Sequence, residues 1–514
     1  MRSPGEPPIH APRSPIAAPA ASPGFASVGR NSESPGWLSV GIFALIVAFY
    51  FGLVPLGQWQ ADEFDYFGRL RQAGVPAFIT RMSWSPRPVA EPLYIIYGLL
   101  ANSFHRPLAG VFLGLLWIGF LFCACFSAWT GGDKDRRLPA LLTGLALAAA
   151  FLTSGPLFQV FYWPAGAVAY LPTLAATLLV FLQILDGRLS SSRGRTLCCF
   201  ALLVAALSSE MGAMFAASFA IFEAITSLRR TGEHEGRIAW WLLPGVAGAG
   251  VLLWLATHRL PAAEAAFTVT SAALHSPLQS AMAAAGRLAL EVVGWSSGTK
   301  HASSVLLSLM SRLALAVGVA LLWPKPQGPS QSERSSASRQ IPIIGAALLA
   351  ACFASLFASY LHFGAAGGER YETLRRCWIV LAYATLGAAF LAARFQKLRV
   401  RGNTVATLLL LAGVLLPWHV SPLAREYAAY GRVRDAVEQT FQSGYQPGSE
   451  MFYAVPPSGG VITPAVLGPG TYTATSQATE FNYAAYILTY FSKQTLVVSP
   501  LPPQADLPTA PPAP

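Results

Sequence analysis

The sequence predicts an all-α polytopic membrane protein, one that crosses a lipid bilayer many times. Three properties of its 514 residues indicate this class: 54% are hydrophobic, only 11% are charged, and the mean hydropathy is +0.46. Soluble domains are about 45–50% apolar and about 25% charged, so the shortage of charge separates this chain from them most clearly. A single water-soluble core stops growing at roughly 250–300 residues. We therefore expect lipid to solvate the apolar segments.

Repeated apolar runs predict about 11 transmembrane helices, since each span needs about 20 mostly apolar residues. One stretch, 196–228, is too long for a single span and short for two, and Ser208, Ser209 and Glu210 interrupt it. We expect two short helices that meet at Glu210, because a single span would reverse the orientation of every later helix. The predicted spans are 37–56, 108–129, 138–153, 164–185, 196–207, 212–228, 238–257, 305–323, 341–360, 378–393 and 405–418.

The basic residues predict the orientation. The net charge is +11, but the positive charge is spread over alternate connections between apolar runs, which argues against a nucleic-acid partner. By the positive-inside rule these connections and the N-terminus face the cytoplasm of a bacterial inner membrane. The basic groups are Lys134, Arg136 and Arg137; Arg188, Arg193 and Arg195; Arg229, Arg230 and Arg237; Lys325, Arg334 and Arg339; and Lys397, Arg399 and Arg401.

The remaining segments predict a simple division of the chain. Residues 1–36 and 500–514 are rich in proline and are expected to be a disordered cytoplasmic tail and a second tail. Residues 37–420 are the transmembrane domain, with 58–106 as its first extracytoplasmic loop. Residues 421–499 are expected to form a small extracytoplasmic α/β lobe, which is periplasmic in this orientation. The six cysteines lie in or beside apolar runs and lack metal-ligand spacing, so no metal site is predicted from them.

An acidic motif follows the first predicted span. Asp62 and Glu63 stand a few residues outside it, where a carboxylate facing a cavity could act as general base toward a hydroxyl while its neighbour orients it or helps to hold a divalent cation. The alternative is a solvated acidic loop. Further along the same loop, Arg87 lies between Pro86 and Pro88, which stiffen the backbone. A stiff arginine suits a phosphate, although an interfacial anchor explains it equally well.

Three other groups are candidates for binding a substrate. Tyr162, Trp163 and Tyr170 lie at the outer end of the fourth predicted span, where an aromatic belt is the competing explanation. Glu210 is an ionisable residue in an apolar stretch. Burying such a residue in a membrane is costly, which indicates a function. The alternative is a glutamate in a surface loop between two short spans. Arg370 and Arg375 place positive charge outside, against the general trend, which suggests an anionic ligand such as a lipid phosphate or else pairing with nearby glutamates.

The order of these motifs resembles the GT-C superfamily of membrane glycosyltransferases, and within it an uncharacterised bacterial family of multi-spanning proteins. The resemblance covers roughly the first 230 residues, and Pro86 and Met211 depart from its pattern. The matching motifs are Asp62-Glu63-Phe64-Asp65, Trp84 with Arg87, Tyr162-Trp163-Gly166-Tyr170 and Ser209-Glu210.

This resemblance implies transfer of a sugar from a polyprenyl-phosphate donor to an envelope glycan, lipid or protein acceptor on the periplasmic side, with inversion. Asp62 would be the base, and Arg370, Arg375 or Arg87 would stabilise the leaving phosphate. The absence of a P-loop motif agrees with a lipid-linked donor that needs no cytoplasmic nucleotide site. The alternatives are an envelope polysaccharide polymerase or ligase, a lipid or solute transporter, and a membrane protein without catalysis.

Overall fold

Helices follow the apolar runs of the sequence along the whole body of the protein. The computed structural model describes residues 34–76, 79, 86–130, 134–228, 235–259, 276–295, 301–322, 331–391, 402–455, 467–473 and 483–500. The tails predicted at 1–33 and 501–514 and the predicted motif residue Trp84 lie outside these ranges.

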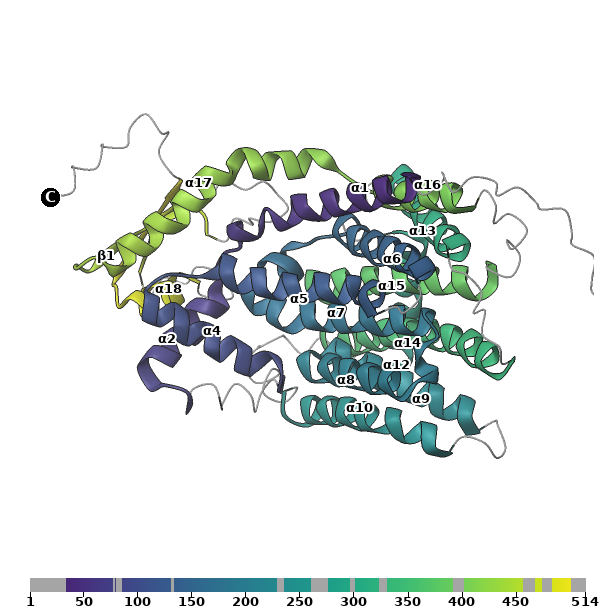
Figure 1. Ribbon diagram of the computed structural model, residues 1–514. Helices are drawn as coiled ribbons and strands as arrows, with labels where there is room; N and C mark the ends of the chain where they lie inside the picture. The colour runs from purple at the N-terminus through teal and green to yellow at the C-terminus, as the bar shows by residue number, and fades with distance from the viewer. Residues whose placement is uncertain are drawn as a thin grey trace, which may run out of the picture.

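Up to Leu228 the described residues form eight α-helices, which are labelled in Figure 1, and three short 3-10 or π-helical turns. They are α1 (Ser34–Phe51), η1 (Val54–Leu56), α2 (Ala61–Ala73), α4 (Ala90–Phe104), α5 (Ala109–Thr130), α6 (Lys134–Thr153), η2 (Phe158–Tyr162), α7 (Pro164–Leu185), η3 (Arg188–Ser190), α8 (Ser192–Ser208) and α9 (Glu210–Leu228).

The second half continues the helical body and adds a small sheet. Its elements are α10 (Glu235–Trp254), η4 (Leu255–Arg259), α12 (Pro277–Val293), α13 (Ala302–Leu322), α14 (Gln331–Phe363), α15 (Glu369–Leu386), η5 (Gly387–Leu391), α16 (Gly402–Leu415), α17 (Val420–Tyr445), β1 (Glu450–Val455), β2 (Gly470–Thr473), α18 (Tyr483–Phe491) and β3 (Thr495–Pro500).

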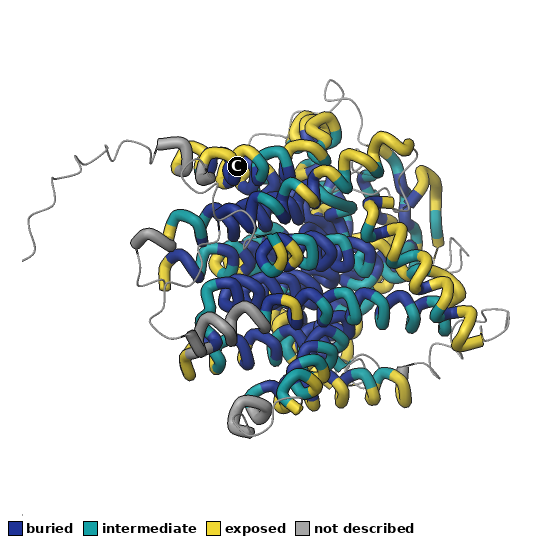
Figure 2. Tube along the Cα trace, turned by 90° about the vertical axis from the view of Figure 1, so that its right-hand side faces the viewer, coloured by how far each residue is buried: buried dark blue, intermediate teal, exposed yellow. Residues whose placement is uncertain are grey.

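The lengths and compositions of the helices agree with a membrane protein that has many spans. Within the described residues, eight helices are long and apolar enough to cross a bilayer, and α16 with α17 makes a ninth if this pair, bent by 63°, is one span. All 11 predicted segments are mostly helical where they are described, but the apolar part of α6, Arg137–Thr153, and α8, with 17 residues, are shorter than the eight, which have 19 to 24 residues. The count of 11 therefore stays a prediction. Exposed residues lie on the outside of this body (Figure 2), and many of them are large hydrophobic residues, as a lipid-facing surface requires.

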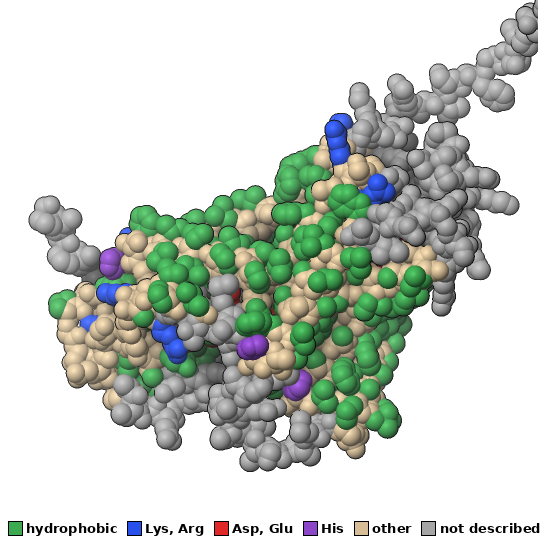
Figure 3. All heavy atoms as spheres, turned by 90° about the horizontal axis from the view of Figure 1, so that it is seen from below, with side chains coloured by type: hydrophobic (Ala, Val, Ile, Leu, Met, Phe, Trp, Pro, Cys, Tyr) green, Lys and Arg blue, Asp and Glu red, His purple; other side chains and the backbone are tan. Residues whose placement is uncertain are grey.

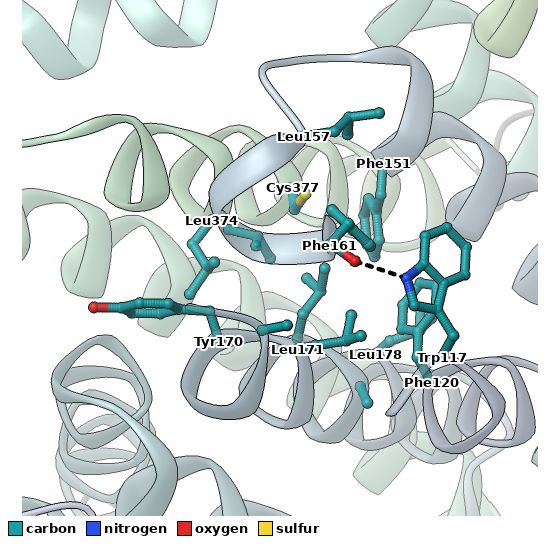
Figure 4. Close-up of a cluster of buried hydrophobic side chains, with 14 of the residues drawn as sticks. Trp117, Phe120, Phe151, Leu157, Phe161, Tyr170, Leu171, Leu178, Leu374 and Cys377 are labelled. Carbon is teal, nitrogen blue, oxygen red and sulfur yellow. Dashed lines mark hydrogen bonds between the residues drawn. The ribbon is translucent and has the colours of Figure 1, made fainter. Parts of the chain in front are cut away.

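Helix α7 is the central helix of the body. In its most apolar 18-residue stretch, 94% of the residues are buried, whereas the corresponding stretch of α5 is 28% buried. Side chains of α5, α6, η2 and α15 pack around it, and Trp117 donates from its indole nitrogen to the Phe161 carbonyl oxygen at 2.9 Å (Figure 4). Residues carried by α7 are therefore held by packing on all sides.

The predicted break near Glu210 is confirmed. Helix α8 ends at Ser208, Ser209 has extended backbone angles, and α9 begins at Glu210 and packs back against α8. The Ser209 hydroxyl accepts from the Gly212 amide at 3.0 Å, which caps the start of α9. Gly212 allows this close return, because a Cβ atom there would meet the Ala205 carbonyl oxygen at less than van der Waals distance.

The C-terminal region joins the first loop at one end of the helical body (Figure 1). Its three strands have the order β1-β3-β2, with β3 parallel to β1 and antiparallel to β2. Helix α17 packs on β1, and α18 packs on α2. The side of the membrane on which this region lies remains a prediction. Sequence reasoning did not identify α12, which lies in the outside segment 258–301 between two predicted spans.

The α8–α9 return predicts a sharp difference between two glycines. Replacing Gly212 with Ala should lower the free energy of unfolding by about 1–3 kcal/mol, because the new methyl group overpacks a helix crossing. Gly250 of α10 has nothing within 4 Å of its Cβ position, so Gly250→Ala should be neutral or slightly stabilising. Thermal unfolding of both detergent-purified variants measures this, and equal midpoints would contradict the close return.

Candidate functional site

The first turn of α2 is anchored by the carboxylate of Glu63. This side chain is fully buried and accepts three N–H hydrogen bonds. The Gln60 amide donates to Oε2 at 2.8 Å, the Trp163 indole donates to Oε2 at 2.9 Å, and the Ala165 amide donates to Oε1 at 2.8 Å. The last two donors belong to the beginning of α7. One side chain therefore joins the helix after the first span to the central helix.

Burial also changes the acidity of this carboxyl group. It raises the pKa of Glu63 from 4.5 to about 8, although the N–H groups of Gln60, Trp163 and Ala165 favour the ionised form. Because these donors occupy both oxygens, the predicted role of Glu63 as a ligand for a divalent cation does not fit this geometry. The structure gives Glu63 a positioning role. The described residues contain no group of three or more His, Cys, Asp or Glu side chains suited to a metal.

Asp62 lies beside the C-terminal region. It is half-buried in the first turn of α2, and its charge acts on Tyr483 of α18, whose pKa is raised to about 12 chiefly by burial. No hydrogen bond to Asp62 is present among the described residues. Its carboxylate is therefore held in place by the Glu63 anchor next to it rather than by bonds of its own.

A second polar cluster surrounds Glu210, at the start of α9. The guanidinium of Arg87 donates from Nη2 to both carboxylate oxygens, at 3.0 and 3.2 Å, and the Tyr170 hydroxyl donates to Oε1 at 3.1 Å. The Tyr371 hydroxyl makes a short hydrogen bond to the same oxygen. Segments from four distant parts of the sequence therefore converge on one carboxylate, and Figure 4 shows the Tyr170 hydroxyl pointing away from the apolar cluster behind its ring.

The backbone explains how Arg87 reaches this position. The Val89 amide donates to the Leu207 carbonyl at 3.1 Å, which fastens the proline-flanked segment to the end of α8. Arg87 is buried, and the Glu210 charge nearby holds the pKa of its guanidinium above the usual value despite its burial. A buried pair of this kind is strongly destabilised if one partner is removed. Arg87 is therefore committed to Glu210.

Arg370 is the cation of this cluster that has no carboxylate in ion-pair contact among the described residues. Its guanidinium lies over the rings of Tyr170 and Tyr371, at 5.9 and 5.4 Å from their centroids. Its backbone amide donates to the Gln159 side chain at 3.3 Å. Stacking on two rings orients the guanidinium and leaves its N–H groups able to bind an anion.

A groove of about 510 Å³ adjoins this cluster. Its lining is mainly apolar and comes from α9, α10 with η4, α14 and the beginning of α15, and it includes Glu210, Arg370 and Tyr371. Seen from below, the described surface of the molecule carries many hydrophobic side chains, with a few basic and histidine side chains and a small acidic spot among them (Figure 3). The groove therefore combines an apolar channel with a cation at one wall, which suits a lipid that carries an anionic group.

Three predicted binding residues are not in this cluster. Arg375 is fully buried, and its guanidinium binds both oxygens of Glu291 in α12 at 2.8 and 2.9 Å, so its assignment to a phosphate is wrong. Tyr162 is also fully buried, and its hydroxyl donates to the Tyr50 carbonyl at 2.8 Å, which leaves it a structural residue. Trp163 contributes through its bond to Glu63 and not through substrate contact.

Sequence reasoning missed one member of the cluster and the partner of Arg375. Tyr371 follows Arg370 directly, and the pairing of the two with Tyr170 becomes visible only when α15 is placed beside α7. Glu291 lies in the expected outside segment 258–301. Its position four residues after Arg287, the spacing of an ion pair on a helix, was the available signal.

The Glu63 anchor predicts a large loss of stability in Glu63→Ala. Three buried N–H groups would lose their acceptor, at a cost of about 1–3 kcal/mol each. We expect the unfolding midpoint of the detergent-purified variant to fall clearly, while Asp62→Asn, one residue away, stays near the wild type. An unchanged midpoint for Glu63→Ala would show that the carboxylate does not hold α2 on α7.

The raised pKa of Glu63 predicts a pH effect with a definite sign. Between pH 4.5 and about 8 the folded protein retains a proton that the unfolded chain has lost, so this group's contribution to stability declines as the pH rises through that window. The wild-type unfolding midpoint should therefore fall more between pH 6 and 9 than that of Glu63→Gln, which cannot titrate. The Gln variant starts lower, because an amide nitrogen cannot accept. Parallel curves would contradict the assignment.

Comparison with protein-family models, with curated proteins and with solved structures found no match for this chain. The resemblance to GT-C glycosyltransferases therefore stays an expectation from the sequence motifs. What the chain does has to be inferred from its anchored acidic helix, its Glu210 cluster and the groove beside them.

Proposed function

We propose that this protein is a membrane glycosyltransferase that moves a sugar from a polyprenyl-phosphate donor to an envelope glycan, lipid or protein acceptor. The observation that carries the proposal is the position of Arg370, a guanidinium without an ion-pair partner among the described residues, at the wall of an apolar groove. A lipid-linked phosphate needs an apolar channel for its chain and a cation for its head. Both requirements meet at this place.

In this proposal Arg370 binds the donor phosphate, and Asp62 activates the acceptor. In this mechanism the Asp62 carboxylate takes the proton of the acceptor hydroxyl, whose oxygen forms a bond to the anomeric carbon of the donor sugar. The bond from that carbon to the phosphate oxygen breaks, and its electron pair leaves on the lipid phosphate. One displacement of this kind inverts the anomeric centre. Arg370 stabilises the charge that develops on the leaving phosphate.

Two positioning groups support this chemistry. Glu63 fixes the first turn of α2 against the beginning of α7, which sets the position of Asp62. From Ala165 to Tyr170 the same helix advances by about 8 Å, so one rigid element relates Asp62 to the Glu210 cluster. The Arg87–Glu210–Tyr170 group orients Tyr371 and through it Arg370, and its polar atoms are also suited to bind sugar hydroxyls.

The orientation belongs to the same proposal. With 11 spans and the N-terminus in the cytoplasm of a bacterial inner membrane, the beginnings of α2, α7, α9 and α15 all lie on the periplasmic side. The basic connections between the helices then remain inside. A periplasmic site agrees with a lipid-linked donor, which is available there when nucleotide sugars are not.

Transfer assays with the purified protein test this function. The full chain is placed in lipid nanodiscs with a panel of radiolabelled polyprenyl-phosphate sugars and envelope acceptors. Wild-type protein should cleave one of these donors and transfer its sugar. Asp62→Asn and Arg370→Gln should each lower transfer by at least about 100-fold, since each removes a group that acts in the transition state.

Asp65→Asn is the matched control for these variants. Asp65 lies on the same helix three residues after Asp62, and it pairs at 2.8 Å with Arg69, whose side chain is exposed to solvent, so the pair is worth little. Its activity should stay within a few-fold of the wild type. Full activity of Asp62→Asn would remove the base assignment. Movement of an intact donor across the membrane without cleavage would instead support the transporter alternative.

A further inference from the structure

A second cavity, of about 440 Å³, lies on the other side of the first turn of α15. Its lining residues lie at or near the ends of five helices, which are α6, α12, α13, α15 and α16. Its lining includes two arginines, Arg312 and Arg376, and the hydroxyls of Ser304 and Ser308. No lining residue is shared with the groove that contains Arg370. The two cavities are therefore separate sites.

Arg312 is the unusual residue of this cavity. It lies on α13, a candidate membrane span, and only 5% of the residue is exposed. Its Nη1 donates to the main-chain oxygens of Glu291 and Val292, the latter at 2.8 Å, at the end of α12. No carboxylate forms an ion pair with it among the described residues. Helix-end carbonyls offer about half a negative charge, which does not neutralise a buried guanidinium.

The neighbouring charges leave an excess of positive charge. Arg376 also lines the cavity, donates to the Ser154 carbonyl at 2.9 Å and shares Glu372 with Arg287. Among the described residues, the connected group contains four guanidiniums and two carboxylates, an excess of two positive charges. One further acid lines the cavity, the exposed Glu369, and counting it still leaves one positive charge. The four cations are Arg287, Arg312, Arg375 and Arg376, and the two acids are Glu291 and Glu372.

We infer that this cavity binds a phosphate group, through the guanidiniums of Arg312 and Arg376. Guanidinium forks form parallel charge-assisted hydrogen bonds with phosphate oxygens, and the serine hydroxyls supply further donors. A volume of about 440 Å³ is large enough for a phosphate together with the organic group that it carries. The inference does not depend on the proposed glycosyl transfer, because none of these residues belongs to the Asp62 or Arg370 sites.

Binding measurements on the full chain distinguish the two sources of such a phosphate. Protein in phosphatidylcholine nanodiscs is titrated with inorganic phosphate and followed by thermal unfolding, since a ligand of the folded state raises the midpoint. In a second arm, retention of phosphatidic acid is measured by native mass spectrometry. A rise of the unfolding midpoint with inorganic phosphate indicates that the natural ligand is water-soluble. Retention of phosphatidic acid without such a rise indicates that the cavity binds a lipid headgroup. No response in either arm would overturn the inference.

Variants show whether the response comes from this cavity. Arg312→Gln and Arg376→Gln should each weaken the responding probe by about tenfold or more, and Arg312→Lys should retain part of the affinity. Arg287→Gln is the matched control, because it removes a positive charge from the same ion-pair group without lining the cavity. If Arg287→Gln weakened binding equally, the loss of affinity would come from the change in net charge, and this result would contradict a phosphate site in the cavity. If one cavity variant fails to fold, the other still decides the question.

Discussion

The carboxylate of Glu63 is the interaction on which the site geometry depends. It is fully buried, and two of its three hydrogen-bond donors lie on a different segment, at the beginning of α7. Its hydrogen bonds to Trp163 and Ala165 hold the loop between the first two spans against the centre of the helical body. Because α7 is packed on all sides, a residue fastened to it inherits its rigidity. Asp62 is positioned in this way while its own side chain remains partly exposed.

Buried ion pairs organise the rest of the polar interior. Arg87 with Glu210 and Arg375 with Glu291 each join segments more than 80 residues apart, and both pairs are almost inaccessible to solvent. In surroundings that cannot solvate a single charge, each arginine specifies the position of its acid, and a misplaced helix would leave both charges unpaired. These pairs therefore select one arrangement of helices from the many that apolar packing alone would permit.

The beginning of α15 contributes residues to both of the cavities described above. Arg370 and Tyr371 face an apolar groove, whereas Glu369 and Arg376 face a polar cavity. A helix has about 3.6 residues per turn, so neighbouring residues in this turn point to different sides. A short run of charged residues thus supplies two sites. In the two proposals, a lipid phosphate and a second phosphate group bind to residues of the first two turns of this helix.

The sequence by itself determined the class of the protein and the positions of its long apolar helices. Charge depletion and apolar runs depend only on composition and local order, and the interruption at Ser208–Glu210 was enough to predict two helices there. The motif order also singled out Arg87, Tyr170 and Glu210, which do meet. Their convergence required long-range contacts that no local pattern encodes.

Only the tertiary structure decided which charged residues are free to bind. Arg370 and Arg375 look alike in the sequence, but five positions on a helix turn them to different neighbours, one to two tyrosine rings and the other to Glu291. Arg312 gave no signal in the sequence, and Glu291 gave only its spacing from Arg287, since a buried charge is recognised by what surrounds it. Burial and pairing are properties of the packed chain, and for that reason the ligand-binding residues could not be separated from the structural ones before the fold was known.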